Sequence, residues 1–308
     1  MQSLIFTVVL LAVQNFAQSR TFTDVIYTRF TESQEENVKS AQTFSLYGAD
    51  LNTPTTQSCT KFFAPLSDKQ KIRIDYFIGY ADDYKDMVRD RSEFMALRAL
   101  LLSPCFDPKH NQLCGFQKPL ATEDLYTKDV RWYDGKIKKI ELYLKNASIS
   151  ESDRFNRSSP EQTAKSTLVR NQFIQAMSQT DLLIYSGHSR FGGGPDFSPV
   201  VYKDHANYKE DVDYYVKNKR GLSDMLQGLG ARSTKPWLIF LGSCDSKKHF
   251  SKSLSTAKNA PHATLLSADI TSELQSHITT IRILDTLTNQ RCPTDPKAHY
   301  QGYELVIN

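Results

Sequence analysis

Two continuous apolar segments constrain the fold of this 308-residue chain more than any other feature. They are Leu182–Ser186 (LLIYS) and Trp237–Leu241 (WLIFL), and neither alternates between apolar and polar residues. A short unbroken apolar run is typical of a strand that is buried on both faces, as in a parallel sheet covered by helices. Helical patterns surround these runs, and we expect helices at 160–178, 221–229, 247–258 and 272–288. Further strands are expected at 263–267 and 303–307.

This alternation of strands and helices predicts an α/β fold, a three-layer sandwich with a mainly parallel central sheet. The preceding part of the chain carries weaker signals. Alternating apolar residues predict a strand over 71–80, and an apolar stripe before Pro104 predicts a helix. Asp134-Gly135 predicts a hairpin turn that leads into a strand over 136–144. Residues 189–218, rich in Gly, Pro, Asp and Tyr, are expected to form a long insertion.

The N-terminus has the pattern of an export signal. Leu4–Val13 is apolar but too short to cross a membrane, and Ala17 suits the last position before cleavage. We therefore expect a signal peptide over 1–17, an extension of uncertain structure over 18–70, and the α/β domain over 71–308. The mature protein is expected to be exported, to the periplasm or the extracellular space, and to have no membrane span after signal removal.

Charge and composition exclude some classes of function. The net charge is only +4 and no dense run of Lys and Arg occurs, so no nucleic-acid partner is expected. No pair of Cys or His has the spacing of metal ligands, so neither a metal nor another cofactor is expected. The oligomeric state stays open.

The chain has five cysteines, and an odd number leaves one thiol unpaired in an oxidising compartment. Cys244 stands apart because it follows the second apolar run. The other four are disulfide candidates: Cys59, Cys105, Cys114 and Cys292. A loop that closes on itself would pair Cys105 with Cys114, which leaves Cys59 for Cys292. The alternative is that some of these four thiols remain free.

Each apolar run ends in a small residue and then a reactive side chain, His188 after the first run and Cys244 after the second. In α/β sheets, function concentrates just beyond the carboxyl ends of the strands. If the two strands are parallel neighbours, an imidazole and a thiol emerge side by side, which is what a cysteine nucleophile with a histidine base requires. Cys244 also precedes an expected helix, whose N-terminus favours the thiolate. Either residue alone would more often be structural, so the hypothesis depends on the pair.

Two further motifs lie beside His188. Gly192-Gly193-Gly194 suits either a nest of backbone N–H groups that binds an anion or a flexible turn. Gly187-His188-Ser189 begins like the nucleophile elbow of serine esterases, but position 191 is Phe instead of Gly and no helix is expected directly after Ser189. A serine mechanism is therefore the weaker alternative.

The two strand ends, Leu182–His188 and Leu238–Cys244, resemble those of the caspase-like cysteine peptidases, the group of caspases, metacaspases, legumain and gingipains. As an order of elements the resemblance covers about residues 136–290. It implies a caspase-like fold with His188 as general base and acid and Cys244 as nucleophile. It also implies an oxyanion hole made by the backbone N–H groups of Cys244 and of Ser189, which stands where most of the group has Gly.

By this resemblance the protein is expected to be an exported cysteine endopeptidase. It would hydrolyse a peptide or protein substrate through a Cys–His dyad and an acyl-enzyme. The alternative is a catalytically inactive relative that binds peptides or the cell envelope. The preferred cleavage site stays open, because pocket residues on loops decide it.

Overall fold

The structure is a computed structural model. It describes residues 61–82, 88–104, 113–119, 124–132, 134–204, 206–290, 300 and 302–308. The chain divides into two compact units, Met1–Pro54 and Thr55–Asn308, and all described residues lie in the second. The expected signal peptide and most of the expected extension lie outside the described residues.

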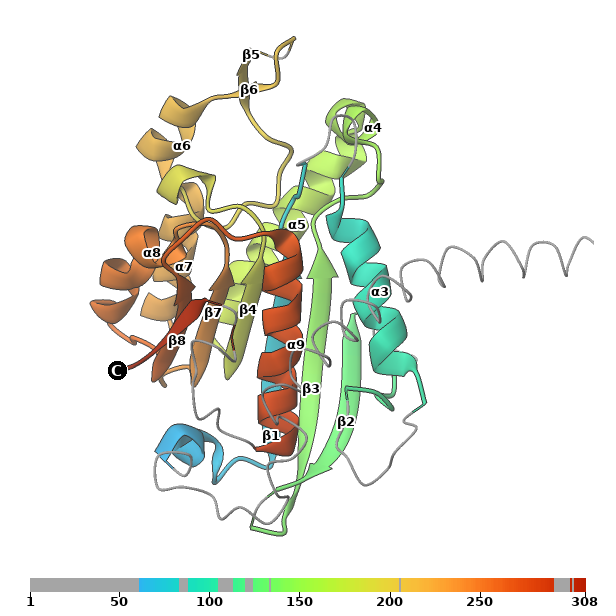
Figure 1. Cartoon of the computed structure of the whole chain (residues 1–308), viewed down its shortest axis with the longest axis vertical. Coiled ribbons are helices and arrows are strands. Elements are labelled where there is room, and N and C mark those ends of the chain that lie inside the picture. Colours follow the sequence, from blue (N-terminus) through green and yellow to red (C-terminus); the bar gives the residue numbers. More distant parts are fainter. Residues whose placement is uncertain are drawn as a thin grey trace, which may run out of the picture. The chain divides into compact units, whose positions relative to one another are not determined.

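A seven-stranded sheet of order β2-β3-β1-β4-β7-β8-β9 forms the middle layer (Figure 1). Its strands are β1 (Lys71–Ile78), β2 (Leu125–Arg131), β3 (Ile137–Asn146), β4 (Leu182–Ser186), β7 (Leu238–Gly242), β8 (Ala263–Ser267) and β9 (Tyr303–Ile307). The inner strands β3, β1, β4, β7 and β8 are parallel, while β2 and β9 are antiparallel to their neighbours at the two edges. The predicted mainly parallel sheet is confirmed.

Helices cover both faces of the sheet. On one face, α3 (Asp90–Leu102) and α9 (Glu273–Asn289) contribute Leu97, Leu101 and Leu284 to a core that includes Ile184. On the other face, α5 (Pro160–Met177), α7 (Arg220–Gly230) and α8 (Ser246–Ser255) contribute apolar residues to a second core. The sheet residues of that core are Phe77, Leu183, Tyr185, Ile239, Leu241 and Leu266. The predicted α/β sandwich is therefore present, with the sheet between two helical layers.

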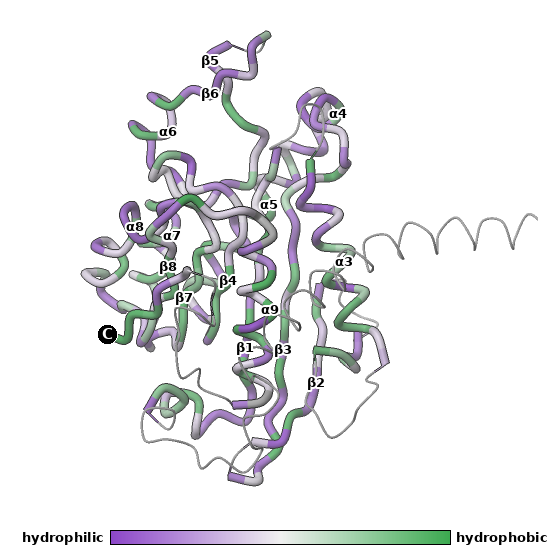
Figure 2. The backbone as a smooth tube through the Cα atoms, in the orientation of Figure 1, coloured by the Kyte–Doolittle hydropathy of each residue, from purple (hydrophilic) through white to green (hydrophobic). Residues whose placement is uncertain are grey.

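The local sequence explains the central elements. Every residue of β4 and β7 is buried, as their unbroken apolar runs predict, and both strands are hydrophobic over most of their length (Figure 2). Pro160 is the first residue of α5, where its missing N–H costs no helical hydrogen bond. A capping box of Ser272 and Gln275 begins α9.

Two regions differ in detail from the expectation. The expected insertion contains short elements: η2 (Arg190–Gly192), β5 (Tyr202–Asp204), β6 (Lys209–Glu210) and α6 (Val212–Asn218). The packed unit also reaches further toward the N-terminus than residue 71. Phe62 and Phe63 join the core beside η1 (Ala64–Leu66), and Trp237 Nε1 donates a 2.7 Å hydrogen bond to the Phe62 carbonyl.

One more short helix, α4 (Asp153–Ser158), precedes α5. Within the described ranges, no helix has the length and apolar character needed to span a membrane.

Candidate active site

The ends of β4 and β7 meet in register. Ser186 pairs with Gly242, and the next amide, Gly187 N–H, donates to the Gly242 carbonyl at 3.1 Å. Ser276 of α9 contacts both residues, through the Ser186 hydroxyl at 2.8 Å and the Gly242 carbonyl at 3.3 Å. His188 and Cys244 each follow this aligned pair by two residues. The structure thus places both at the carboxyl ends of adjacent parallel strands, equally far beyond the sheet.

Cys244 is a free, half-buried thiol. Its Sγ donates to the Thr271 carbonyl, in the segment that leads into α9, at 3.4 Å. Helix α8 begins two residues later at Ser246, so the thiol lies close to a helix N-terminus, as the sequence predicts. Asp245 occupies the N-cap position, but its side chain makes no capping hydrogen bond because its backbone is left-handed, with φ 52°.

The His188 ring faces a carboxylate that the sequence analysis did not single out. His188 Nε2 lies 3.7 Å from Asp82 Oδ1. Asp82 follows β1, and β1 is the neighbour of β4 on the side opposite β7. Three adjacent parallel strands therefore end in Asp82, His188 and Cys244, in that spatial order. A carboxylate beside the imidazole can orient the ring and stabilise its protonated form.

Asp82 is held in place by two arginines. Its side chain is 4% exposed, and its two oxygens lie 3.1 Å from Arg190 Nη2 and 3.4 Å from Arg157 Nη2. These guanidinium groups offset the negative charge of a carboxylate that has lost most of its water. Sequence reasoning missed Asp82 because its role depends on the order of strands in the sheet. The available signal was an acidic residue just beyond the strand expected at 71–80.

Backbone strain gathers at both strand ends. Arg190 and Phe191, soon after His188, have φ of 45° and 54°, and Asp245, directly after Cys244, has φ 52°. A residue with a side chain in the left-handed region costs of order 1–2 kcal/mol, and such residues cluster at functional sites. Among the described residues, Tyr208, Lys219 and Gln290 adopt the same backbone conformation elsewhere, so the strain marks the two strand ends without by itself assigning them a role.

The side chain of Tyr185, in β4, holds the backbone of His188 in place. The buried Tyr185 hydroxyl donates to the His188 carbonyl at 3.0 Å and accepts from the Asp196 N–H at 3.1 Å. Burial raises the pKa of Tyr185, so the hydroxyl keeps its proton and remains a donor. A Cβ at Gly187 would lie 2.7 Å from this hydroxyl, and Gly187 has φ 154°. The glycine before His188 is therefore required by the packing of Tyr185 and by the backbone conformation.

The three glycines after His188 do not form an anion nest. Gly192 and Gly194 donate their N–H groups to the Ser189 carbonyl, and Gly193 donates to the Arg190 carbonyl. The glycines serve close packing instead, since a Cβ at Gly194 would lie 2.1 Å from the Leu222 nitrogen. Of the two sequence interpretations, the anion nest is therefore wrong.

Ser189 lacks the setting of a nucleophile elbow. Its side chain is buried, and the element that follows is the three-residue turn η2 instead of a long helix. Its backbone N–H, however, and that of Cys244 donate no hydrogen bond to any part of the chain that the structure describes. Two unpaired N–H groups at neighbouring strand ends are the equipment of an oxyanion hole.

The disulfide predictions are tested only in part. Cys244 is free and Cys114 is disulfide-bonded. The expected partner, Cys105, and the remaining candidates, Cys59 and Cys292, lie outside the described residues, so the pairings stay predictions.

In the described ranges, no group of three or more His, Cys, Asp or Glu residues is arranged to hold a metal ion.

Comparison of the chain with protein-family models gives no match, and comparison with curated proteins gives none either. The resemblance to caspase-like peptidases therefore depends on the two strand ends and on the order of elements around them.

Proposed function

We propose that this protein is an exported cysteine endopeptidase of the caspase-like type, with Cys244 as nucleophile and His188 as general base and acid. The observation that carries the proposal is the registered parallel pairing of β4 with β7, which brings the two residues to one edge of the sheet. Asp82 beside His188, and the unpaired N–H groups of Ser189 and Cys244, support the same chemistry.

In the proposed reaction, the Cys244 thiol first leaves the Thr271 carbonyl and transfers its proton to His188. Since Nε2 of His188 faces Asp82, Nδ1 is the nitrogen that takes this proton. The thiolate then bonds to the carbonyl carbon of a peptide, and the carbonyl electron pair moves onto oxygen. The N–H groups of Ser189 and Cys244 stabilise the oxyanion.

Collapse of the oxyanion breaks the C–N bond, and the His188 imidazolium gives its proton to the leaving amine. Water then attacks the thioester while His188 takes one of its protons, and the C–S bond breaks to regenerate the thiol. Asp82 does not touch substrate in this scheme. It positions the imidazole and stabilises its charge while the proton resides there.

The test compares parent protein with Cys244→Ala and Ser189→Ala on a mixed library of amidated peptides, with products identified by mass spectrometry. We expect parent and Ser189→Ala to cleave and Cys244→Ala to be inactive, because the serine hydroxyl has no role. Equal turnover by parent and Cys244→Ala would reject the cysteine mechanism. Loss of activity in Ser189→Ala alone would favour a serine esterase or peptidase.

The inactive alternative has its own signature in the same experiment. The hydrogen bond from Cys244 to Thr271 is the feature that favours it, since this contact keeps the thiol away from a base. A parent protein that cleaves no peptide and reacts slowly with iodoacetamide at Cys244 would support a binding module in place of a peptidase.

A further inference from the structure

The small hairpin of β5 and β6 lies beyond the main sheet and takes no part in the proposed reaction (Figure 1). Tyr202 and Glu210 are directly opposite each other in its antiparallel register. The base of the hairpin is fixed, since the Val201 N–H donates to the Tyr215 hydroxyl at 2.8 Å and the Asp211 N–H donates to the Val201 carbonyl at 2.8 Å. Directly opposite residues of an antiparallel pair share one face, so Tyr202 and Glu210 present neighbouring side chains.

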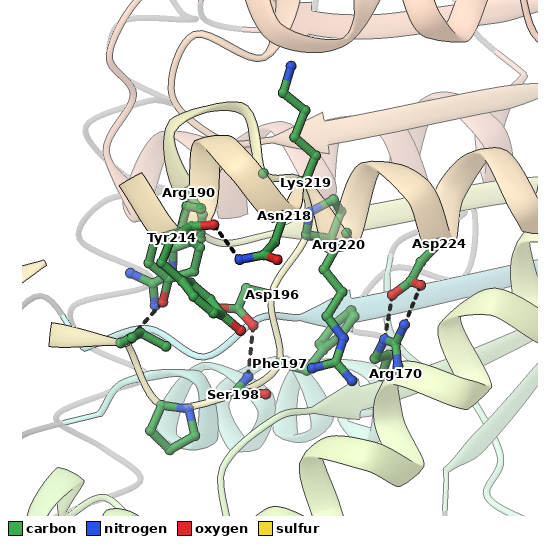
Figure 3. A pocket seen from close by; sticks show the side chains of 17 residues that line it. Arg170, Arg190, Asp196, Phe197, Ser198, Tyr214, Asn218, Lys219, Arg220 and Asp224 are labelled. Atoms are coloured by element: carbon green, nitrogen blue, oxygen red, sulfur yellow. Dashed lines mark hydrogen bonds and ion pairs between the residues drawn. The ribbon is translucent and has the colours of Figure 1, made fainter. Parts of the chain in front are cut away.

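Glu210 contacts the first of the two arginines that hold Asp82. Its Oε2 lies 3.6 Å from Arg190 Nη1, while Nη2 of the same guanidinium lies 3.1 Å from Asp82 Oδ1. Nη1 is buried and has no hydrogen-bond partner within the described ranges, so the Glu210 carboxylate acts on it through charge alone. Asp196 takes the Nε donor at 3.2 Å, and both Arg190 and Asp196 lie in the wall of a pocket (Figure 3). One buried positive charge is therefore shared by three carboxylates.

Tyr202 contacts the second arginine. Arg157 Cζ lies 4.4 Å from the centroid of the Tyr202 ring, a cation–π contact, and Arg157 Nη2 lies 3.4 Å from Asp82 Oδ2. Arg157 Nε donates to Asp153 at 2.5 Å, and its Nη1 donates to the Val200 carbonyl at 2.7 Å. Burial and then the charge of Asp82 raise the pKa of Tyr202 to about 12, so the phenol stays neutral while its ring covers a charged pair.

Both contacts reach Asp82 through rigid groups. A guanidinium is planar, so a contact that fixes one of its nitrogens also fixes the others. Burial lowers the pKa of Arg190, but nearby acidic groups, with Asp82 first and Glu210 among them, outweigh it and raise the pKa overall. Glu210 offsets part of the Arg190 charge, so less of the Asp82 charge is neutralised. More of that charge then acts on the His188 ring, 3.7 Å away.

We propose that Glu210 and Tyr202 are positioning residues, which stabilise the protonated form of His188. They act through the two arginines that hold Asp82 and do not themselves enter the reaction. A ligand or partner that displaces the hairpin would therefore lower the share of protonated His188. The role in catalysis rests on the proposed function, whereas the coupling of the hairpin to His188 does not.

The test measures the protonation of His188 directly, by NMR of isotope-labelled histidine ring signals as the pH is varied. Full-length Cys244→Ala protein is used, so that the result does not depend on turnover. The chain has seven histidines, and the His188 signal is assigned by its loss in His188→Gln. We expect Glu210→Gln to move the midpoint of this titration to lower pH by about half a unit, since one negative charge is removed from the cluster.

Matched variants separate this coupling from general effects of charge. Asp213→Asn removes the same charge from an exposed position in α6, where Asp213 pairs with Lys203 at 3.8 Å, and should leave the midpoint unchanged. Tyr202→Leu removes the ring that keeps water from Arg157 and Asp82, and should also lower the midpoint because water screens the carboxylate. Tyr202→Phe keeps the ring over Arg157 and should retain the midpoint.

An unchanged or raised midpoint in Glu210→Gln would overturn the inference, as would equal shifts in Glu210→Gln and Asp213→Asn. Far-UV circular dichroism establishes that each variant is folded. Equal midpoints for Tyr202→Leu and Tyr202→Phe would likewise overturn the role of Tyr202, and this pair tests the coupling even where Glu210→Gln fails to fold. A parent protein that cleaves no peptide would reject the proposed function alone, because the titration is measured without catalysis.

Discussion

The Tyr185 hydroxyl offers a single-atom test of how the site is held together. It is buried, and it satisfies the His188 carbonyl at 3.0 Å and the Asp196 N–H at 3.1 Å. Tyr185→Phe keeps the ring in the core between α5 and the sheet but removes the shared partner of both backbone groups. The His188 carbonyl and the Asp196 N–H then both lose their hydrogen bond to the side chain of this β4 residue.

The size of the effect follows from these two hydrogen bonds. A buried donor or acceptor that loses its partner costs about 1–3 kcal/mol. Two such groups lie beside the partly open end of the sheet, where water can satisfy some of their hydrogen-bonding capacity. We therefore expect Tyr185→Phe to lower the free energy of unfolding by about 2–4 kcal/mol. With a urea slope of about 2–3 kcal/mol/M, the midpoint should fall by about 1 M.

Urea unfolding followed by far-UV circular dichroism measures this loss, and the chain contains a matched control. Tyr126 is equally buried, but its hydroxyl has no hydrogen-bond partner among the described residues. Tyr126→Phe should therefore leave stability unchanged or raise it slightly. Equal midpoints for Tyr185→Phe and the parent, or equal losses in both variants, would refute the argument that the hydroxyl holds the His188 backbone.

Three further predictions address the rest of the domain. Burial raises the pKa of Asp90 to about 7, so the folded protein keeps a proton on this carboxyl that the unfolded chain releases near pH 4. The free energy of unfolding should therefore fall as the pH rises from about 4 to about 7. The Asp90→Asn variant should not show this fall. At pH 8 its free energy of unfolding, measured with urea, should exceed that of the parent by about 2–4 kcal/mol. Asp82→Asn should slow iodoacetamide alkylation of Cys244 about tenfold at pH 7, and an unchanged rate would exclude Asp82 from the site. In Gly194→Ala the added Cβ would lie 2.1 Å from a backbone nitrogen of α7, and the free energy of unfolding should fall by about 3 kcal/mol or more. The control Gly230→Ala adds its Cβ in open space and should leave the free energy of unfolding unchanged or raise it.

The sheet could be predicted where the sequence pattern and burial agree. The unbroken runs of β4 and β7 predict strands covered on both sides, and both are fully buried. The pattern over β1 is less informative. Its alternating residues suggest a strand with one polar face, but β1 lies inside the sheet between β3 and β4, and Asp75 is 1% exposed. Arg73 donates to Asp75 at 2.7 Å, and this local ion pair allows a polar side chain in a central strand.

Some residues of the candidate site could be predicted from the sequence and others could not. His188 and Cys244 could be predicted because each follows its own strand directly. Asp82 could not, because nothing local to 71–82 shows that β1 inserts between β3 and β4. The left-handed backbone of Asp245 was equally hidden, since an Asp before a helix is ordinarily an N-cap with an extended backbone and a capping side chain. Tertiary packing decides both features, and both lie at the proposed reaction centre.

Two features at the strand ends bear on whether the protein is a peptidase or an inactive relative: the Asp82 carboxylate beside His188 and the backbone N–H groups of Ser189 and Cys244. A module that only binds peptides would have no chemical use for a carboxylate facing His188 or for the unpaired N–H groups of Ser189 and Cys244. The ion pairs of Asp82 with Arg190 and Arg157 also give this buried carboxylate a structural role, so its burial alone does not distinguish the two functions. The rate of Cys244 alkylation in Asp82→Asn protein is the measurement that distinguishes them, because only a catalytic role links Asp82 through His188 to the reactivity of the thiol.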